Sequence, residues 1–238
     1  MVENMANPID QRGKERGGIR RYLDTVTPQE YTPQTGEVDL TEISLTGLAD
    51  LYGSDKGKIK HNYTDIYTKL IDELGGRQQS LTVVEVGVAC GASLRMWANY
   101  LPNSWIKGFD IRPECASLCQ DLENVQIHIE DARHYPHPLG IVDLFVDDGS
   151  HIVEDIIGTM LVAQEWVRPG GFYVVEDMSC TYNDAYRDKF NKHFNQNLAN
   201  DRALLMQFFD KLLRMMDTGR GMWSEMRYTN KLWVLKKR

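Results

Sequence analysis

The sequence has few cysteines, no long apolar run and no excess of basic residues. Its four cysteines are too few and too irregularly spaced for a disulfide framework, and no second Cys/His pair accompanies Cys115 and Cys119 to complete a zinc site. No apolar run approaches a membrane span, and the N-terminus lacks the apolar core of a signal peptide. The net charge of −7 argues against nucleic-acid binding, which needs a basic surface. We therefore expect a cytoplasmic protein with reduced thiols and with neither a nucleic-acid nor a membrane partner.

The 238 residues suffice for one sizeable α/β domain with an appendage. Residues 1–40 combine glycine and proline with little hydrophobic periodicity, so we expect an N-terminal arm. The arm carries a locally basic patch, formed by Arg12, Lys14, Arg16, Arg20 and Arg21. Either the arm is a solvated tail, or it packs on a second, acidic subunit and closes over an active site. We expect the protein to form a homo-oligomer. Residues 41–238 are expected to form a single domain, with a helical cap at 41–78 and the core at 79–238.

Short apolar runs recur from Ser80 onward, bounded by glycine or charge and separated by helical segments. The runs cover residues 81–87, 105–110, 125–129, 141–146 and 172–175. Such runs are typical of buried parallel strands joined by helical crossovers. Near the C-terminus, residues 225–228 and 232–235 flank a polar turn and predict an antiparallel hairpin on the sheet edge. The pattern predicts a Rossmann-like, doubly wound α/β fold with a mostly parallel sheet in three α/β/α layers.

Helical periodicity marks the segments outside these runs. Apolar positions between Leu40 and Leu74 fit two amphipathic helices. Residues 184–217 are also predicted to be helical, and we expect their Leu/Phe/Met stripe to belong to the core rather than to a cofactor site. The stripe consists of Leu204, Leu205, Phe208, Phe209, Leu212 and Leu213. Glu154 and Asp155 fall in the first turns of the helix after the fourth strand, and we expect them to be caps or surface residues.

A polar loop joins the two N-terminal helices, and Gly53 and Gly57 bracket its first part. Glycines in such a loop allow its backbone and side chains to approach a ligand closely, although a plain interhelical connection is the alternative. The candidate cofactor contacts of this loop are Tyr52, Ser54 and Lys56, and its candidate acceptor contacts are His61 and Tyr63.

Acidic residues follow two of the predicted strands. Asp147-Asp148-Gly149-Ser150-His151 comes after the fourth run, and Glu176-Asp177 comes after the fifth. The carboxyl ends of parallel strands meet at one sheet edge, where open α/β folds bind ligands. Because like charges repel, a divalent cation is the simplest means of holding several carboxylates together. The alternative is a polar turn followed by a helix N-cap.

The turn after the first predicted strand indicates a second ligand site. It reads E-x-G-x-x-x-G, with Glu85, Gly87 and Gly91 at the fixed positions. Ser93 stands where a dinucleotide fingerprint would have a third glycine. A carboxylate before such a turn repels a pyrophosphate but suits a cationic ligand that carries an amino-acid group.

Acids at the ends of the second and third predicted strands complete this pattern. Asp110 is placed to accept hydrogen bonds from both hydroxyls of a ribose, and Asp131-Ala132 is placed to meet an adenine amino group. The order E-x-G-x-x-x-G, then Asp, then Asp-Ala resembles the class I S-adenosylmethionine-dependent methyltransferases. The terminal hairpin is similar to the antiparallel last strand of that fold.

Three segments extend the resemblance to one group within this class. Tyr52–Gly57, Asp147–His151 and Glu176-Asp177 are similar to motifs of the metal-dependent sugar O-methyltransferases of the mycinamicin type, which act in natural-product and antibiotic biosynthesis. The resemblance implies S-adenosylmethionine and Mg²⁺ as cofactors.

The resemblance also implies roles for individual residues. Mg²⁺ would lie on Asp148, Glu176 and Asp177, with His151 as the base. Asp147 contacts the cofactor, orients His151 or binds metal, and the sequence leaves these alternatives open. Met178 and Tyr182, close to the acidic pair, are further candidate acceptor contacts.

The expected reaction is attack of a hydroxyl group of a small molecule, foremost a sugar of a glycosylated natural product, on the methyl group of a sulfonium. Four alternatives remain at this point. In the first, the acceptor is a phenol or catechol. In the second, the protein is a nicotinamide-dependent oxidoreductase, although the absence of a G-x-G-x-x-G motif counts against this. In the third, it is a metal-dependent hydroxylase, which would need a second histidine in the cluster, and in the fourth it binds a cofactor without catalysis.

Overall fold

A computed structural model of the chain describes residues 40–135 and 140–238. Residues 1–39, which make up nearly all of the expected N-terminal arm and include its basic patch, lie outside the described residues. No helix in the described part of the chain is long and apolar enough to cross a membrane.

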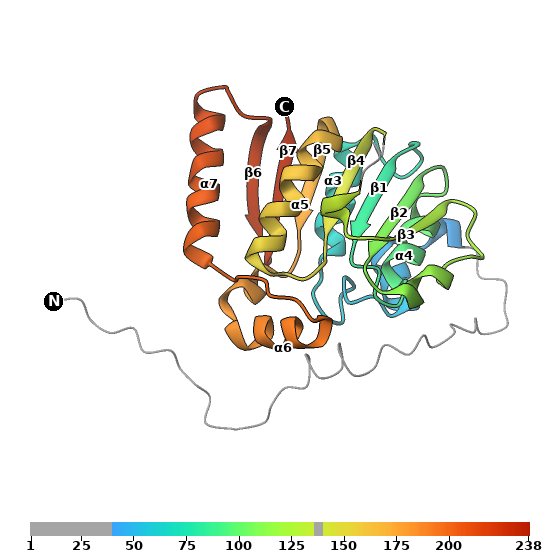
Figure 1. Ribbon diagram of the computed structural model, residues 1–238. Coiled ribbons are helices and arrows are strands. Elements are labelled where there is room, and N and C mark those ends of the chain that lie inside the picture. The colour runs from blue at the N-terminus through green and yellow to red at the C-terminus, as the bar shows by residue number, and fades with distance from the viewer. Residues whose placement is uncertain (1–39, 136–139) are drawn as a thin grey trace.

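One seven-stranded sheet forms the centre of the molecule, in the order β3-β2-β1-β4-β5-β7-β6 (Figure 1). Strands β1 to β5 are parallel, and β7 is antiparallel to both of its neighbours. The strands are β1 (Thr82–Val86), β2 (Trp105–Asp110), β3 (Val125–Ile129), β4 (Val142–Asp147), β5 (Val167–Val175), β6 (Trp223–Thr229) and β7 (Leu232–Lys237). The predicted mostly parallel sheet with a terminal antiparallel hairpin is confirmed.

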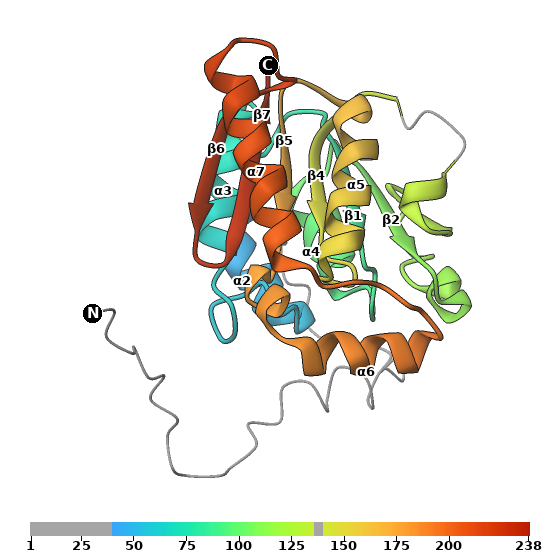
Figure 2. The same cartoon turned by 60° about the vertical axis from the view of Figure 1, so that its left-hand side comes forward.

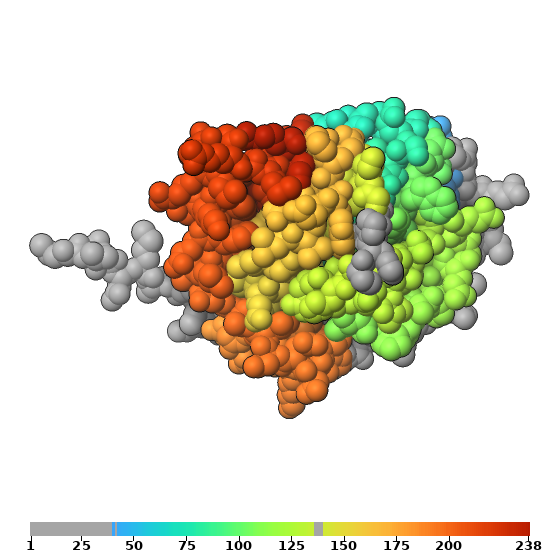
Figure 3. Space-filling model, turned by 45° about the horizontal axis from the view of Figure 1, so that its top comes forward, coloured from blue at the N-terminus to red at the C-terminus, as the bar shows by residue number. Residues whose placement is uncertain are grey.

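Side chains of the strands alternate between two apolar layers, as the pleat of a strand requires. Val83 and Leu144 pack with α2 (Leu45–Tyr52), α3 (Thr64–Glu73) and α4 (Ala92–Tyr100) on one face. Val84 and Phe145 pack with α5 (Val153–Trp166) and α7 (Arg202–Asp217) on the other. Figure 2 shows the two layers of helices, and Figure 3 shows α5 and α7 side by side on the outer face. The predicted three-layer arrangement is therefore present.

The segment 184–217, which the sequence predicts to be helical, forms two helices. α6 (Asp184–Phe194) ends at Asn195, whose φ of 52° is left-handed, and the side chain of Asp201 accepts a hydrogen bond from the Leu204 N–H to begin α7. Asparagine and aspartate favour such termini, so the polar stretch between the helices breaks the pattern. The break turns α6 across the end of the sheet at which the parallel strands finish (Figures 1 and 2). The predicted helical structure is therefore present as two helices, and Leu205, Phe209 and Leu212 of the predicted stripe are buried in the core.

Short 3₁₀ helices follow three of the parallel strands and orient their terminal side chains. They are η2 (Pro113–Ser117), η3 (Ala132–His134) and η4 (Met178–Tyr182), whereas η1 (Leu40–Glu42) precedes α2. η3 begins where the side chain of Asp131 accepts a hydrogen bond from the Arg133 N–H, and η4 begins directly after Asp177. The acidic residues at these strand ends therefore sit in tight turns with defined directions.

Candidate active site

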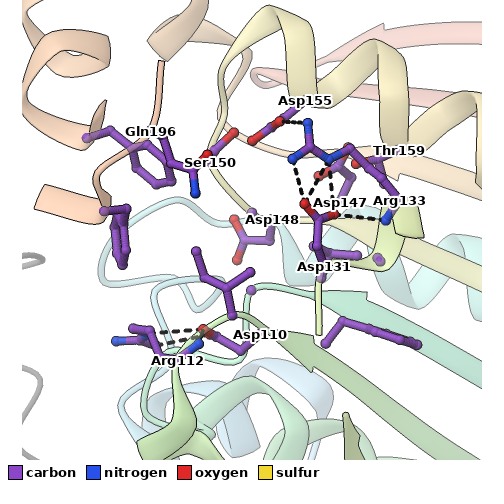
Figure 4. A pocket seen from close by; sticks show the side chains of 18 of the residues that line it. Asp110, Arg112, Asp131, Arg133, Asp147, Asp148, Ser150, Asp155, Thr159 and Gln196 are labelled. Atoms are coloured by element: carbon purple, nitrogen blue, oxygen red, sulfur yellow. Dashed lines mark hydrogen bonds and ion pairs between the residues drawn. The ribbon is translucent and has the colours of Figure 1, made fainter. Parts of the chain in front are cut away.

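A cavity of about 370 Å³ opens at the carboxyl edge of the parallel strands. The ends of β1 to β4 form one side of it and α6 forms the other (Figure 4). Six residues predicted for cofactor or metal binding line this cavity: Gly87, Asp110, Asp131, Ala132, Asp147 and Asp148. The structure thus gathers residues from four separate strand ends around one space.

Gly87 brings the cofactor turn against the acidic turn. Its φ of +95° is left-handed, and a Cβ at this position would lie 2.1 Å from the carbonyl oxygen of Asp148. The Asp148 N–H donates to the carbonyl of Val86 at 3.0 Å, which fixes the approach from the other side. Only glycine fits here, because any side chain would push the two turns apart.

Asp110 sits at the centre of a set of donors. Its Oδ2 accepts hydrogen bonds from the backbone N–H groups of Val88 and Ala89 at 3.0 and 3.1 Å. The guanidinium of Arg112 donates to both of its oxygens at 3.1 Å. Burial alone would raise the pKa of Asp110, but the hydrogen bonds from Arg112 outweigh it and the pKa is lowered. Asp110 is therefore an ionised acceptor at the cavity wall.

Asp131 has a similar partner in Arg133, whose guanidinium donates to both Asp131 oxygens (Figure 4). Arg133 also pairs with Asp155, which lines the cavity. The expectation that Asp155 is a cap or surface residue was wrong, because the first turn of α5 faces the cavity. Arg112 and Arg133 were missed in the sequence, although each stands two residues after a predicted cofactor acid, Asp110 or Asp131.

The side of the cavity formed by α6 is aromatic. Tyr186, Phe190, His193 and Phe194 line it. These positions share one helix face, while α6 has no fully buried residue. The aromatic spacing in an otherwise polar helix was the available signal, but these residues were not predicted as site residues.

Lys56 lies in the middle of the acidic residues rather than on the cavity wall. Its side chain is fully buried, and its Nζ lies 2.5 Å from Asp148 Oδ2, 3.0 Å from Glu176 Oε1 and 3.4 Å from Glu85 Oε1. Burial alone would lower the pKa of Lys56, but the three carboxylates outweigh burial and raise it, so the ammonium stays charged. Burial raises the pKa of Asp148 and brings that of Glu176 to about 8 in spite of Lys56. One cation therefore compensates three buried acids only in part.

Two tyrosines donate to the same group of acids. Tyr67 donates to Glu176 Oε1, and Tyr63 donates to Asp177 Oδ1 at 2.5 Å. The second oxygen of Asp177 lies 3.8 Å from His61 Nε2. The remaining oxygen of Asp148, Oδ1, lies at the same distance from His151 Nε2. Both distances are too long for a hydrogen bond and leave the facing atoms available to a ligand.

His151 is buried with one unsatisfied nitrogen. Its side chain is 6% exposed, and its Nδ1 has no hydrogen-bond partner among the described residues. Burial lowers the pKa of His151, so the imidazole is neutral at neutral pH and able to accept a proton. The ring of Tyr186 lies 6.0 Å away, which places His151 beside the α6 side of the cavity.

The acidic residues fit a divalent cation in charge and in donor chemistry. Oxygen donors are what Mg²⁺ prefers, and the negative charge here exceeds that of Lys56. In residues 40–135 and 140–238, however, no three His, Cys, Asp or Glu side chains converge closely enough to hold a metal ion. The Lys56 ammonium lies between two of the three predicted ligands, Asp148 and Glu176.

The other predicted site residues lie away from the cavity wall. Glu85 is fully buried and accepts hydrogen bonds from the Ser93 hydroxyl at 2.6 Å and the Trp97 indole at 2.5 Å. Gly91 precedes α4, Tyr52 ends α2, and the Ser54 hydroxyl accepts from the Lys56 N–H. Met178 is buried, whereas Tyr182 is 69% exposed. Direct contacts of these residues with a cofactor or an acceptor stay predictions.

Curated relatives of this chain are O-methyltransferases whose names specify glycosylated compounds. The 8-demethyl-8-alpha-L-rhamnosyl tetracenomycin-C 2'-O-methyltransferase of Streptomyces olivaceus is 33% identical over 157 residues, which cover 62% of this chain and 41% of that protein. The mycinamicin VI 2''-O-methyltransferase of Micromonospora griseorubida is 31% identical over 152 residues, or 58% of this chain and 37% of that protein. The resemblance to the sugar O-methyltransferases is confirmed. The chain spans about two fifths of the length of these relatives.

A solved structure agrees with the fold. The MycE methyltransferase of the mycinamycin pathway, in complex with Mg, SAH and mycinamycin VI, matches with a TM-score of 0.65 and 23% identity over 82% of this chain and 54% of that one. This likeness shows that the chain shares the Rossmann-like fold of that methyltransferase. No family model matches the chain.

Proposed function

We propose that this protein transfers a methyl group from S-adenosylmethionine to a hydroxyl of a small molecule, foremost a sugar hydroxyl of a glycosylated natural product, in a reaction that depends on Mg²⁺. The observation that carries the proposal is the shared position of Asp148. Asp148 lines the cavity at the ends of β1 to β4, where the predicted cofactor residues lie. Asp148 also belongs to the acidic group around Lys56. A donor site and an acceptor-activating site therefore meet at one residue.

The cavity suits a nucleoside that carries an amino-acid chain. Asp110 is an ionised acceptor for ribose hydroxyls, and the aromatic face of α6 offers a flat apolar surface to a purine. The close turn at Gly87 leaves backbone rather than side chain next to the ligand. S-adenosylmethionine, when bound, supplies a sulfonium whose methyl group is ready for displacement.

Asp148, Glu176 and Asp177 are the residues that would hold Mg²⁺. When bound, the ion would lower the pKa of the acceptor hydroxyl. His151 accepts the proton released from that hydroxyl, because burial keeps its imidazole neutral at neutral pH. Its left-handed backbone, with φ of 55°, turns the ring back toward Asp148.

The acceptor is proposed to enter between η4 and the loop that carries His61 and Tyr63. The turn between β6 and β7 contacts this loop, since the Asn230 amide donates to the carbonyl of His61 at 2.8 Å. The guanidinium of Arg202 lies 4.1 Å above the exposed ring of Tyr182 and donates to its hydroxyl. A flat ring supported on one face is a common platform for a sugar or an apolar ring system.

The test combines binding and turnover. Calorimetric titration should show binding of S-adenosylmethionine and not of NAD, and methyl transfer to a panel of hydroxylated sugars and catechols should stop after exhaustive chelation. His151→Asn, which tolerates the left-handed backbone, should keep cofactor affinity and lose about 10²- to 10⁴-fold in rate. Binding of NAD, full activity without divalent metal, or unchanged turnover in His151→Asn would each contradict a separate part of the proposal.

A further inference from the structure

The segment between α2 and α3, together with the first turn of α3, contacts every acid predicted to hold the cation. We call residues 53–67 the donor segment. Lys56 donates to Asp148 Oδ2 and Glu176 Oε1, Tyr67 donates to Glu176 Oε1, and Tyr63 donates to Asp177 Oδ1. In each acid a named oxygen is held by the donor segment. For Asp148 and Asp177, the second oxygen faces a histidine instead.

The donors are themselves fixed. Lys56, Tyr63 and Tyr67 are all fully buried. Within the donor segment, the Tyr63 N–H donates to the Lys56 carbonyl at 2.9 Å, and the His61 N–H donates to the Asp55 carbonyl at 3.0 Å. Side chains that are packed and bonded in this way cannot change rotamer without breaking several contacts. The donor segment is therefore a rigid frame for the acids rather than a flexible loop beside them.

Such a frame matters for a cation that demands a defined geometry. A carboxylate that is free to rotate loses conformational entropy when it binds a metal, whereas one already held through a single oxygen does not. Groups that hold metal ligands in this way commonly change metal affinity about 10- to 100-fold when they are removed. Lys56 adds charge compensation, which allows three acids to remain close together before any cation arrives.

We propose that Tyr63 and Tyr67 are positioning residues of the cation site. Each hydroxyl holds one oxygen of an acid, Asp177 or Glu176, and leaves the other for a divalent cation, while Lys56 is the internal counter-ion of the group. This inference rests on the proposed function and extends it. The donor segment thus holds the acids at the ends of β4 and β5 in the orientation that a cation needs.

The chain offers a matched control. The Tyr173 hydroxyl donates to Asp147 Oδ2 at 2.6 Å, and Tyr173 is as fully buried as the other two tyrosines. Asp147 lines the cofactor cavity and is not one of the three acids proposed above to hold Mg²⁺. Tyr63→Phe, Tyr67→Phe and Tyr173→Phe therefore each remove one buried hydroxyl from a carboxylate, with a similar expected cost in stability of about 1–3 kcal/mol. A purely structural role would affect all three variants alike.

The experiment is a titration of the full chain with Mn²⁺, at a concentration of S-adenosylmethionine that saturates each variant, followed by electron paramagnetic resonance. Tyr63→Phe and Tyr67→Phe should bind Mn²⁺ about 10- to 100-fold more weakly than the wild type, and Tyr173→Phe should bind it as the wild type does. Circular dichroism checks that each variant is folded.

The outcomes separate the two proposals. Wild-type affinity in both Tyr63→Phe and Tyr67→Phe, or an equal loss in Tyr173→Phe, overturns the positioning role and leaves the proposed function intact. Absence of Mn²⁺ binding by the wild-type chain overturns the metal-dependent function, and the positioning role falls with it. Lys56 is left unchanged in this test, because its removal would leave three buried acids without compensation.

Discussion

Three residues with side chains adopt left-handed backbone conformations at the carboxyl edge of the sheet. Ala89, His151 and Asp177 have φ values of 52°, 55° and 50°. For a residue with a Cβ this conformation costs about 1–2 kcal/mol, and such strain persists where surrounding contacts hold it. At His151 and Asp177 it aims the side chains at the same acidic group. His151 and Asp177 therefore combine a strained backbone with a proposed role in the site.

Gly87 provides a prediction with a matched control in the same chain. Gly87 and Gly76 have nearly equal φ values of +95° and +91°, but a Cβ at Gly76 meets nothing within 4 Å. Gly76→Ala should lose about 1–2 kcal/mol from the backbone conformation alone. Gly87→Ala should lose about 1–3 kcal/mol more, because its methyl group would overlap the carbonyl of Asp148.

Urea unfolding of both glycine variants measures the difference, and calorimetry measures binding of S-adenosylmethionine. Gly76→Ala should bind normally, whereas Gly87→Ala should not, since the two turns that form the cavity are pushed apart. Equal stability and equal binding in the two variants would show that the contact between the turns does not shape the site.

Among the helices, α6 differs from the rest because it packs on a cavity instead of on the sheet. It has no fully buried residue, so little apolar burial holds it in place. Its main apolar contacts are the aromatic side chains that face the cavity. A helix of this kind contributes more to ligand binding than to the stability of the fold.

Phe190 tests this distinction. Phe190→Ala should weaken binding of S-adenosylmethionine about tenfold, the loss expected when roughly half of an aromatic surface no longer covers the ligand. The free energy of unfolding should change little, since Phe190 is only partly buried without ligand. Lys192→Ala, on the exposed side of the same helix, is the control. An unfolding free energy that falls as much as the binding free energy would instead make α6 part of the structural core.

At the scale of the whole molecule, the N-terminal helices are tied to the C-terminal hairpin across 154 residues of sequence. Glu73 at the end of α3 accepts from Arg227 on β6 at 2.6 Å and from Lys236 on β7 at 3.0 Å. Hydrogen bonding to Arg227, opposed by burial and supported by Lys236, lowers the pKa of Glu73 to about 2. This pairing holds α3, and with it the donor segment, against the sheet.

The pairing predicts a defined pH dependence. Because folding lowers the pKa of Glu73 from 4.5 to about 2, its contribution to stability is present above pH 4.5 and is lost as the pH falls toward 2. Glu73→Gln should therefore cost at most about 1 kcal/mol at pH 7, where the partly exposed pair is screened by solvent, and nothing near pH 2. Urea unfolding across this range measures the gap, with Asp72→Asn as an exposed control. A gap that stays constant with pH would contradict the assignment.

The sequence by itself determined the strands and the acids at their ends. Period-two and continuous apolar runs are local properties, and an acid that follows a buried strand must lie at the sheet edge. For this reason the five parallel strands, the terminal hairpin and the gathering of Gly87, Asp110, Asp131 and Asp148 around one cavity were predictable.

Only the tertiary structure decided what these acids contact. Lys56 meets Asp148 over 92 residues of sequence, Tyr67 meets Glu176 over 109 and Tyr63 meets Asp177 over 114. No local pattern records such pairs, because they depend on how the N-terminal helices pack against the far end of the sheet. The turn of α6 across the cavity is likewise a result of packing. The residue types at strand ends can be predicted from local sequence, whereas the residues that they contact depend on how distant segments pack.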